Sequence, residues 1–122
     1  MMLKFCVPRY HAMIDIIKIL KNGGIGVMPT DTIFGLVGSA LYKKTVERIY
    51  KVRKRNPKKP LIILISKIND LKKFGIRLSA RGTLAETLEK IWPGKVSVIL
   101  DLPRATLGKF KYLHRGTGKL AF

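Results

Sequence analysis

Apolar residues recur at three- and four-residue spacing along three stretches of the chain, which predicts three helices. The first covers residues 10–21 and is closed by the Asn-Gly-Gly run at 22–24. The second covers residues 43–54 and stops before Asn56-Pro57, and the third covers residues 79–92. One or two further helical turns are expected over residues 70–74.

The phase of two of these helices predicts which side chains face the core. In the second helix, the stripe formed by Val46, Ile49 and Tyr50 continues to Arg53, which places Arg53 at the end of the core-facing side. In the third helix, Ser79 is the expected N-cap. Its inward-facing residues are expected to be Leu84, Leu88, Ile91 and Trp92.

Shorter apolar segments between the helices predict strands. Residues 25–28 form a short buried strand that Pro29 ends, and 61–65 is apolar throughout, which is typical of a central strand covered on both faces. Residues 96–102 alternate, and a strand pattern begins at 119–122. Residues 30–38 lack a clean period and are expected to be a loop running into irregular structure. Strands separated by helices predict a single α/β or α+β domain over residues 1–122.

Composition adds an expected class of partner. The 122 residues are 47% hydrophobic, which excludes a disordered chain, and 25 Lys and Arg against 7 Asp and Glu give a formal charge of +18. That charge favours nucleic acid, nucleotide phosphates or an acidic membrane surface, without choosing among them. The single Cys6 excludes an internal disulfide, and no apolar run reaches the length of a membrane span. We therefore expect a cytoplasmic protein with no membrane partner.

The chain offers little for metal or covalent chemistry. His11 and His114 lie far apart, and Cys6 has no recognisable histidine partner, so neither a metal site nor a nucleophile is expected. The glycine-rich run at 23–26 leads into a strand instead of following one. It therefore does not form a P-loop or a dinucleotide-binding turn.

A basic cluster carries the main candidate chemistry, because six of the nine residues at 51–59 are cations. Arg53 and Arg55 could fork onto phosphate oxygens, and Lys59, fixed by the following proline, could supply a point charge. The alternative is a solvated helix end whose cations complement the helix dipole. The residues for which we prefer that alternative are Lys51, Lys54 and Lys58.

A second candidate lies at the end of the first strand, where residues 29–32 (PTDT) offer two hydroxyls and a carboxylate. Open sheets commonly bind ligands at such a strand end. The alternative is an ordinary Asx or Ser/Thr turn in which Asp31 caps the local backbone, and the residues alone favour it.

Taken in order and spacing, three motifs resemble the YrdC/TsaC family of threonylcarbamoyl-AMP synthases. They are PTDTIFGL at 29–36, RKR at 53–55 followed by KPL at 59–61, and WPG at 92–94, and the resemblance spans roughly residues 12–122. It implies a YrdC-like domain with a twisted mixed sheet flanked by helices. It also implies condensation of L-threonine, bicarbonate and ATP to threonylcarbamoyl-AMP and pyrophosphate, the first step toward threonylcarbamoyladenosine in tRNA.

The resemblance also assigns roles to individual residues. Thr30, Thr32 and Phe34 would bind threonine. Arg53, Arg55, Lys59 and Lys119 would bind ATP, with Arg53 in place of the usual Lys. Some members carry a threonine-contacting His at the position of Leu64, so that contact is absent here. Mg²⁺ would accompany ATP, held mainly by phosphates and water. No covalent intermediate is implied, and downstream threonylcarbamoyl-transfer proteins would receive the product.

The sequence departs from the family at its end, because members continue with an Arg-x-Pro and a Ser-x-Asn segment that complete the site. We therefore expect the 122 residues to be the N-terminal portion of the domain, and this form could be inactive. One alternative is a non-catalytic module of the same fold that binds double-stranded RNA or tRNA. Another is the YrdC-like domain of a larger carbamoyl-transfer enzyme of the hydrogenase-maturation type. Flanking zinc-finger and acylphosphatase-like segments would mark it, and the start at Met1 argues against them.

Overall fold

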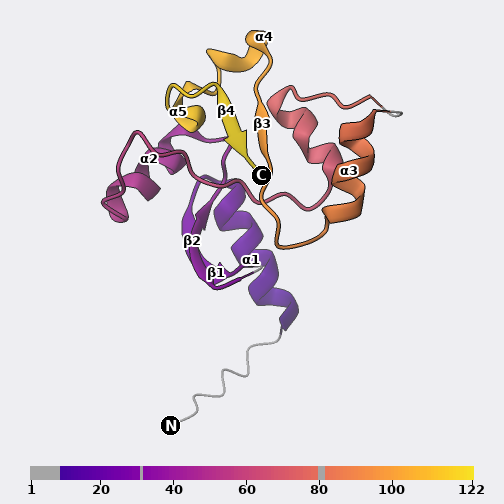
Figure 1. Ribbon diagram of the computed structural model, residues 1–122. Coiled ribbons are helices and arrows are strands. Elements are labelled where there is room, and N and C mark those ends of the chain that lie inside the picture. The colour runs from indigo at the N-terminus through magenta and orange to yellow at the C-terminus, as the bar shows by residue number, and fades with distance from the viewer. Residues whose placement is uncertain (1–8, 31, 80–81) are drawn as a thin grey trace.

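The computed structural model describes residues 9–30, 32–79 and 82–122 as helices joined to small antiparallel sheets (Figure 1), and it confirms the mixed α/β class. In chain order the elements are α1 Arg9–Lys21, β1 Ile25–Pro29, β2 Phe34–Gly38, α2 Lys43–Val52, the 3₁₀ helix η1 Ile68–Phe74, α3 Thr83–Ile91, β3 Ile99–Asp101, α4 Arg104–Leu107, α5 Lys111–His114 and β4 Lys119–Ala121. None of the helices within the described ranges is both long and apolar enough to cross a membrane.

The first sheet is a hairpin of β1 and β2, paired from Ile25 with Gly38 to Pro29 with Phe34. The expectation that residues 30–38 are irregular is therefore wrong for 34–38. No alternation is visible in the sequence FGLVG because two of its five residues are glycines, and four of the five are half-buried, so neither face of the strand is marked by polar residues. Gly38 is needed where α2 crosses the strand, since a Cβ there would lie 2.5 Å from the methyl group of Thr45.

The second sheet pairs β3 with β4 antiparallel, and an isolated parallel bridge joins Ile62 to Ala121. The prediction of a covered central strand at 61–65 is wrong. The segment is extended, and the Ile63 N–H donates to the carbonyl of Ala121 at 2.9 Å. Ile63 is 6% exposed, whereas Ile62 and Leu64 are 59% and 58% exposed. Only one side of this apolar segment is packed within the described chain.

Two helices differ from the expected phase. α2 ends at Val52, and Arg53 is its exposed C-cap, so the placement of Arg53 on the core-facing side is wrong. The Arg53 N–H still donates to the Ile49 carbonyl at 3.0 Å, but the helix ends there, Lys54 turns the chain with a left-handed φ of 46°, and the Arg53 side chain stays exposed instead of entering the core. The expected N-cap at Ser79 is also wrong, because α3 begins at Thr83 after the N-cap Gly82.

The later start of α3 changes its buried face. Leu84 is 45% exposed, and Ala85 is buried in its place. The inward placement of Leu88 is confirmed, since that side chain is fully buried. Ile91 and Trp92 are half-buried against the core.

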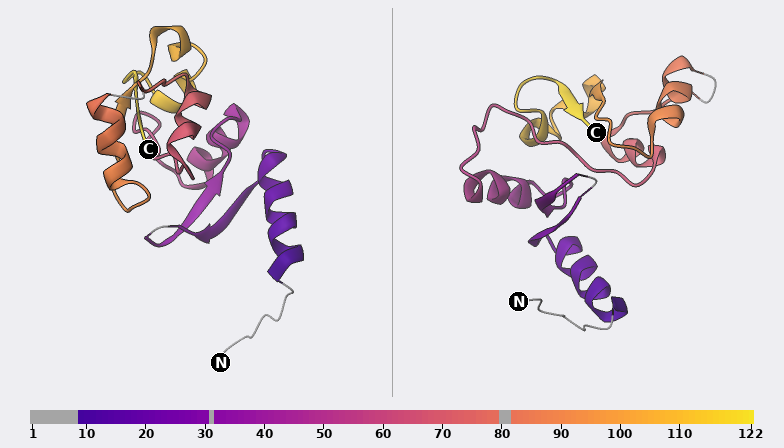
Figure 2. Two further views of the ribbon diagram at one scale, coloured as in Figure 1. Left: turned by 90° about the vertical axis from the view of Figure 1, so that its right-hand side faces the viewer. Right: turned by 60° about the horizontal axis from the view of Figure 1, so that its bottom comes forward.

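The core lies between α2, η1, α3 and the β3–β4 pair, and α1 lies apart from it beside the hairpin (Figures 1 and 2). Phe74 connects its parts, with ring centroids 5.3 Å from Phe110 and 5.2 Å from Phe122. The stretch after α2 crosses the middle of the molecule between the hairpin side and the α3 side (Figure 1). That crossing sets the chain segment 61–66 opposite the hairpin turn.

Candidate functional site

A cleft of about 720 Å³ opens between the β1–β2 hairpin, the end of α2 and the crossing segment 61–66. Its volume falls within the range typical of small-molecule sites. Thr30 and Thr32 line it from the hairpin, and Arg53 and Arg55 line it from the end of α2. Residues that are 21 or more positions apart in the sequence therefore line one cleft.

The hairpin wall is shaped by the turn between β1 and β2. The Thr30 hydroxyl donates to the Ile33 carbonyl at 2.6 Å and accepts the Thr32 N–H at 3.4 Å. The interpretation of this segment as a Ser/Thr turn is confirmed for Thr30, while the capping role considered for Asp31 lies outside the described residues. Phe34 is 71% exposed and is not among the residues that line the cleft.

The opposite wall carries the basic loop, which we define as residues 53–60. Arg53 is exposed, and Arg55 is half-buried. The Nη2 of Arg55 donates to the carbonyl of Pro60 at 3.0 Å, and its Nε lies 3.5 Å from the carbonyl of Lys59. Since a guanidinium has five N–H donors, these bonds fix Arg55 and still leave donors for a ligand.

The two remaining predicted phosphate ligands lie outside the cleft lining. The exposed Lys59 contributes its backbone carbonyl to the loop, which accepts the hydroxyl of Tyr50 at 2.8 Å. The Nζ of Lys119 lies 3.4 Å from the carboxylate of Asp101 on the β3–β4 pair. The structure thus brings Thr30, Thr32, Arg53 and Arg55 together, and the ligand roles of all seven residues stay predictions.

Asp70 is a buried member of the cleft wall that sequence reasoning missed. Its Oδ2 accepts the backbone N–H of Ser66 at 3.1 Å, the hydroxyl of Ser66 at 2.9 Å and the N–H of Lys67 at 3.2 Å. Its Oδ1 lies 2.8 Å from the Nζ of Lys73. The Lys73 ammonium and then the Ser66 hydroxyl hold the pKa of Asp70 well below its usual value. A serine four residues before an aspartate at a helix start was the available signal.

The cleft's chemistry is that of an anion and hydroxyl site. Within the described ranges no three His, Cys, Asp or Glu side chains gather as metal ligands. Cations reach the cleft from three segments, as Arg53 and Arg55, Lys73 and Lys95. Such an arrangement suits a ligand with several negative charges, and a divalent cation would arrive with that ligand.

A second hollow of about 710 Å³ adjoins the cleft along the crossing segment, and the two share Thr30, Ser97 and residues 62–66. The WPG motif lines it, and the Trp92 Nε1 donates to the carbonyl of Val96 at 2.7 Å. This hydrogen bond fixes the indole at the rim of an apolar surface that includes Ile62 and Val96.

Comparisons with known proteins show the family of this chain. The model of the Sua5/YciO/YrdC family, described as "Telomere recombination", matches residues 18–122. A putative threonylcarbamoyl-AMP synthase of Methanocaldococcus jannaschii is 30% identical over 83 residues, which cover 68% of this chain and 39% of the relative. The threonylcarbamoyl-AMP synthase of Nitrosococcus oceani is 29% identical over 100 residues, covering 79% of this chain and 53% of the relative.

Solved structures show the same fold. A variant of Pyrococcus abyssi Sua5 superposes with a TM-score of 0.75 at 22% identity, covering 98% of this chain and 35% of that one. The same enzyme in complex with L-threonine gives a TM-score of 0.73 at 22% identity, covering 88% of this chain and 30% of the other. The chain spans roughly 30–50% of the length of these proteins. With the family model matching from residue 18 to the last residue, this chain belongs to the Sua5/YciO/YrdC family.

Proposed function

We propose that the chain provides the ATP- and threonine-binding part of an L-threonylcarbamoyladenylate synthase. The observation that carries the proposal is the shared cleft, which is lined both by the threonines of the hairpin turn and by the arginines of the basic loop. The names of the curated relatives support the reaction, and the Pyrococcus abyssi complex supports L-threonine as the amino-acid substrate.

In the proposed reaction the amine of L-threonine captures bicarbonate as a carbamate. A carbamate oxygen then attacks the α-phosphorus of ATP, and the bond to the leaving pyrophosphate breaks. The product is threonylcarbamoyl-AMP. Charge builds up on phosphate oxygens during this step, so the chemistry calls for positioned cations and requires no covalent nucleophile. The cleft walls offer cations and hydroxyls of that kind.

Within this scheme the two walls have different tasks. Arg53 and Arg55 would hold the ATP phosphates, with Lys59 and Lys119 contributing charge from outside the cleft lining. Thr30 and Thr32 would contact threonine, and Phe34, which lies outside the cleft lining, would act only from the adjoining strand β2. Leu64 lines the cleft as a 58%-exposed apolar side chain, and it would give the threonine methyl group an apolar neighbour. Mg²⁺ would enter bound to ATP, and threonylcarbamoyl-transfer proteins would take the adenylate.

The deciding experiment combines ATP binding with product formation. Calorimetry with the 122-residue chain and Mg-ATP is expected to show binding that disappears when Arg53 and Arg55 are both replaced by Ala. Any pyrophosphate release, by this chain or by one that carries the rest of the domain, is expected to need both L-threonine and bicarbonate. Release that is indifferent to threonine, or ATP binding that survives the double replacement, would exclude the proposal.

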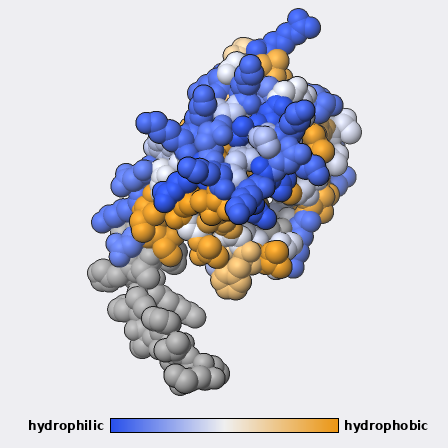
Figure 3. Space-filling view, turned by 90° about the vertical axis from the view of Figure 1, so that its left-hand side faces the viewer, coloured by the Kyte–Doolittle hydropathy of each residue, from blue (hydrophilic) through white to orange (hydrophobic). Residues whose placement is uncertain are grey.

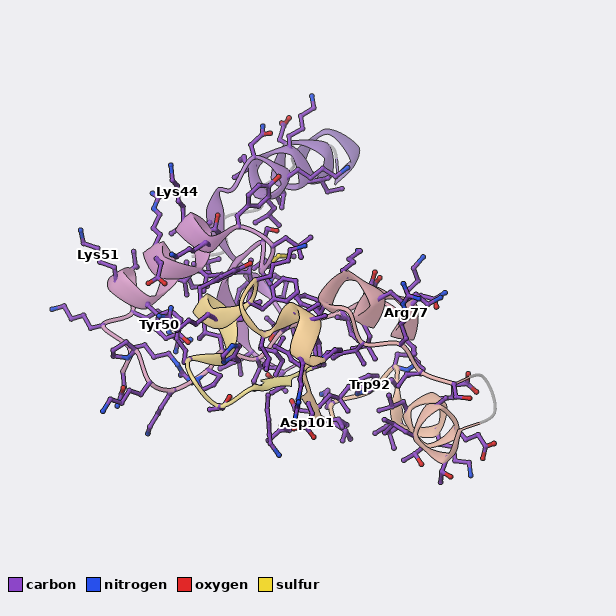
Figure 4. The ribbon with its side chains drawn as sticks, turned by 90° about the horizontal axis from the view of Figure 1, so that it is seen from above. Lys44, Tyr50, Lys51, Arg77, Trp92 and Asp101 are labelled. Atoms are coloured by element: carbon purple, nitrogen blue, oxygen red, sulfur yellow. The ribbon has the colours of Figure 1, made fainter. Side chains whose placement is uncertain are left out.

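A second candidate function, binding of RNA or tRNA, is favoured by the outer face of α2. Lys44, Arg48 and Lys51 follow one another at i, i+4 and i+7 and are exposed. No ion pair found in the described part of the chain includes them. Lys44 and Lys51 extend from the helix on the side away from Tyr50 (Figure 4), and hydrophilic residues cover much of that face of the molecule (Figure 3).

This surface suits nucleic acid better than a lipid bilayer. A helix that lies on a membrane inserts an apolar face. The apolar side chains of α2 are committed to the core instead, since Val46, Ile49 and Tyr50 are at most 5% exposed. Like charges at these spacings destabilise a helix by about 0.2–0.5 kcal/mol per pair. A partner with regularly spaced phosphates would remove that repulsion.

A further inference from the structure

The basic loop is closed by local bonds at each end. The Arg55 N–H donates to the carbonyl of Tyr50 at 3.1 Å, just after the left-handed turn at Lys54. Further along, the Lys58 N–H donates to the side-chain oxygen of Asn56 at 2.9 Å and the Lys59 N–H to its carbonyl at 3.1 Å. These bonds shape two tight turns, and other contacts must hold one turn against the other.

Tyr50 makes the contact that joins the far end of the loop to α2. Its side chain is 5% exposed, and its hydroxyl donates to the Lys59 carbonyl at 2.8 Å. The same carbonyl lies 3.5 Å from the Nε of Arg55. One backbone oxygen is thereby bound from both sides of the loop, by a residue of the helix and by a residue of the cleft wall.

Arg115 in turn fixes the ring of Tyr50. The Cζ of Arg115 lies 3.9 Å from the ring centroid, and its Nη2 lies 3.1 Å from the Oε1 of Glu47, one turn earlier on α2. The Arg115 side chain is only 13% exposed, and its Nε and Nη2 are buried without a hydrogen-bond partner among the described atoms. The contact of Nη2 with Glu47 is therefore an ion pair that lacks hydrogen-bond geometry. Burying an unsatisfied donor is unfavourable, so the stacking on Tyr50 and the Glu47 pair must hold Arg115 there.

We propose that Tyr50 and Arg115 are positioning residues for the ATP site, an inference that rests on the proposed role of the basic loop in binding ATP. Arg115 holds the Tyr50 ring, Tyr50 holds the Lys59 carbonyl, and that carbonyl sets the turn from which Arg55 reaches the cleft. Neither residue touches the ligand. Their contribution is to order the loop before ATP arrives, which removes an ordering penalty from binding.

Tyr50→Phe tests this series of contacts, because it removes the hydroxyl that binds the Lys59 carbonyl and keeps the ring under Arg115. In the absence of ATP, the backbone amides of the non-proline residues at 53–59 are expected to exchange hydrogen about fivefold faster than in the wild type. The dissociation constant for Mg-ATP is expected to rise about three- to tenfold, as for one lost hydrogen bond. At saturating ATP, exchange in the loop is expected to return to the wild-type level. A merely destabilised fold would not show that recovery.

Tyr112→Phe is the matched control. It removes a half-buried tyrosine hydroxyl that donates to the Ala40 carbonyl at 2.9 Å, away from the basic loop. Exchange of residues 53–60 is expected to stay at the wild-type rate in this variant. Arg115→Met keeps bulk over the Tyr50 ring and removes the cation. It is expected to loosen the loop in the same direction as Tyr50→Phe.

The outcomes separate this inference from the proposed function. If hydrogen exchange in the loop is unchanged in Tyr50→Phe, the positioning role is overturned, whatever the affinity of the variant for Mg-ATP. Faster exchange with unchanged ATP affinity overturns it too, since the loop would then not prepare the site. If the wild-type chain does not bind ATP, the proposed function fails, and the exchange measurement alone still decides whether Tyr50 and Arg115 order the loop.

Discussion

The Arg55 guanidinium donates to the Pro60 carbonyl at 3.0 Å, so a cation of the cleft wall also closes the loop on which it stands. Lys58 lies in the same loop, but only its backbone N–H makes a bond, to the Asn56 side chain. The two residues share a charge and a loop and differ in what their side chains hold. That difference separates cations that build the site from cations that only face solvent.

Arg55→Ala is therefore expected to weaken Mg-ATP binding more than about tenfold, because it removes a phosphate-facing charge and a loop contact together. Lys58→Ala should be nearly silent, since no side-chain bond is lost. Arg55→Lys keeps the charge but lacks the planar fork, and should recover only part of the affinity. Titration calorimetry at fixed ionic strength measures all three, and equal losses in Arg55→Ala and Lys58→Ala would refute the division of roles.

Asp70 makes the stability of the chain depend on pH. Its carboxylate has a lowered pKa in the folded state, so its contribution is present above the unfolded-state pKa of about 3.9. That contribution is lost as pH falls through the folded-state pKa. Asp70→Asn is expected to reduce the free energy of unfolding by about 1–3 kcal/mol at pH 7. The difference from wild type should shrink on acidification below about pH 4.

Asp101→Asn is the control for this measurement. Its carboxylate also faces a lysine, Lys119, but its side chain is 81% exposed and the separation is 3.4 Å. Exposed pairs contribute little, so denaturant melts of this variant should match wild type within about 0.5 kcal/mol at every pH. A loss as large as that of Asp70→Asn would show that the buried Ser66 and Lys67 bonds are not the cause.

Two leucines of α3 test the phase of that helix. Leu88 is fully buried, so Leu88→Ala should reduce the free energy of unfolding by about 2–5 kcal/mol. Leu84 is 45% exposed, so Leu84→Ala should lower it by less than about 1 kcal/mol. Urea melts of the two variants compare identical truncations four residues apart. Similar losses would place both side chains in the core, as the sequence period alone predicts.

The sequence predicts this fold best where one face of a helix or strand is buried in the core and the other face is exposed to solvent. α2 shows a clear stripe because Val46, Ile49 and Tyr50 all enter one core. The segment 61–65 is apolar at every position, so its sequence does not indicate which side chains are buried and which are exposed. The structure packs Ile63 and leaves Ile62 and Leu64 exposed. β2 was missed for a related reason, because its glycines carry no side chains that reveal a period.

For the candidate site, the chain segments could be predicted but not the contacts between them. Thr30, Thr32, Arg53 and Arg55 stand in recognisable motifs, and all four line the cleft. Asp70 and Arg115 stand in no such motif. The role of Arg115 depends on its ring contact with Tyr50, 65 positions earlier in the chain, and such a contact leaves no local pattern. Residues that support a site through distant packing therefore escape this kind of sequence reasoning.

Salt dependence tests whether the outer face of α2 binds RNA. Each phosphate contact that a cation makes steepens the fall of log affinity with log salt, by about 0.7 for a single strand and about 0.9 for a B-form duplex. Replacing Lys44, Arg48 and Lys51 together by Gln should reduce that slope by about 2–3 for a short RNA duplex measured by fluorescence anisotropy.

The ATP affinity should be unchanged, because none of the three lines the cleft. A control of equal charge replaces the exposed residues Lys72, Lys90 and Arg104. If the control lowers the slope as much, binding follows net charge, and the α2 surface has no special part in it.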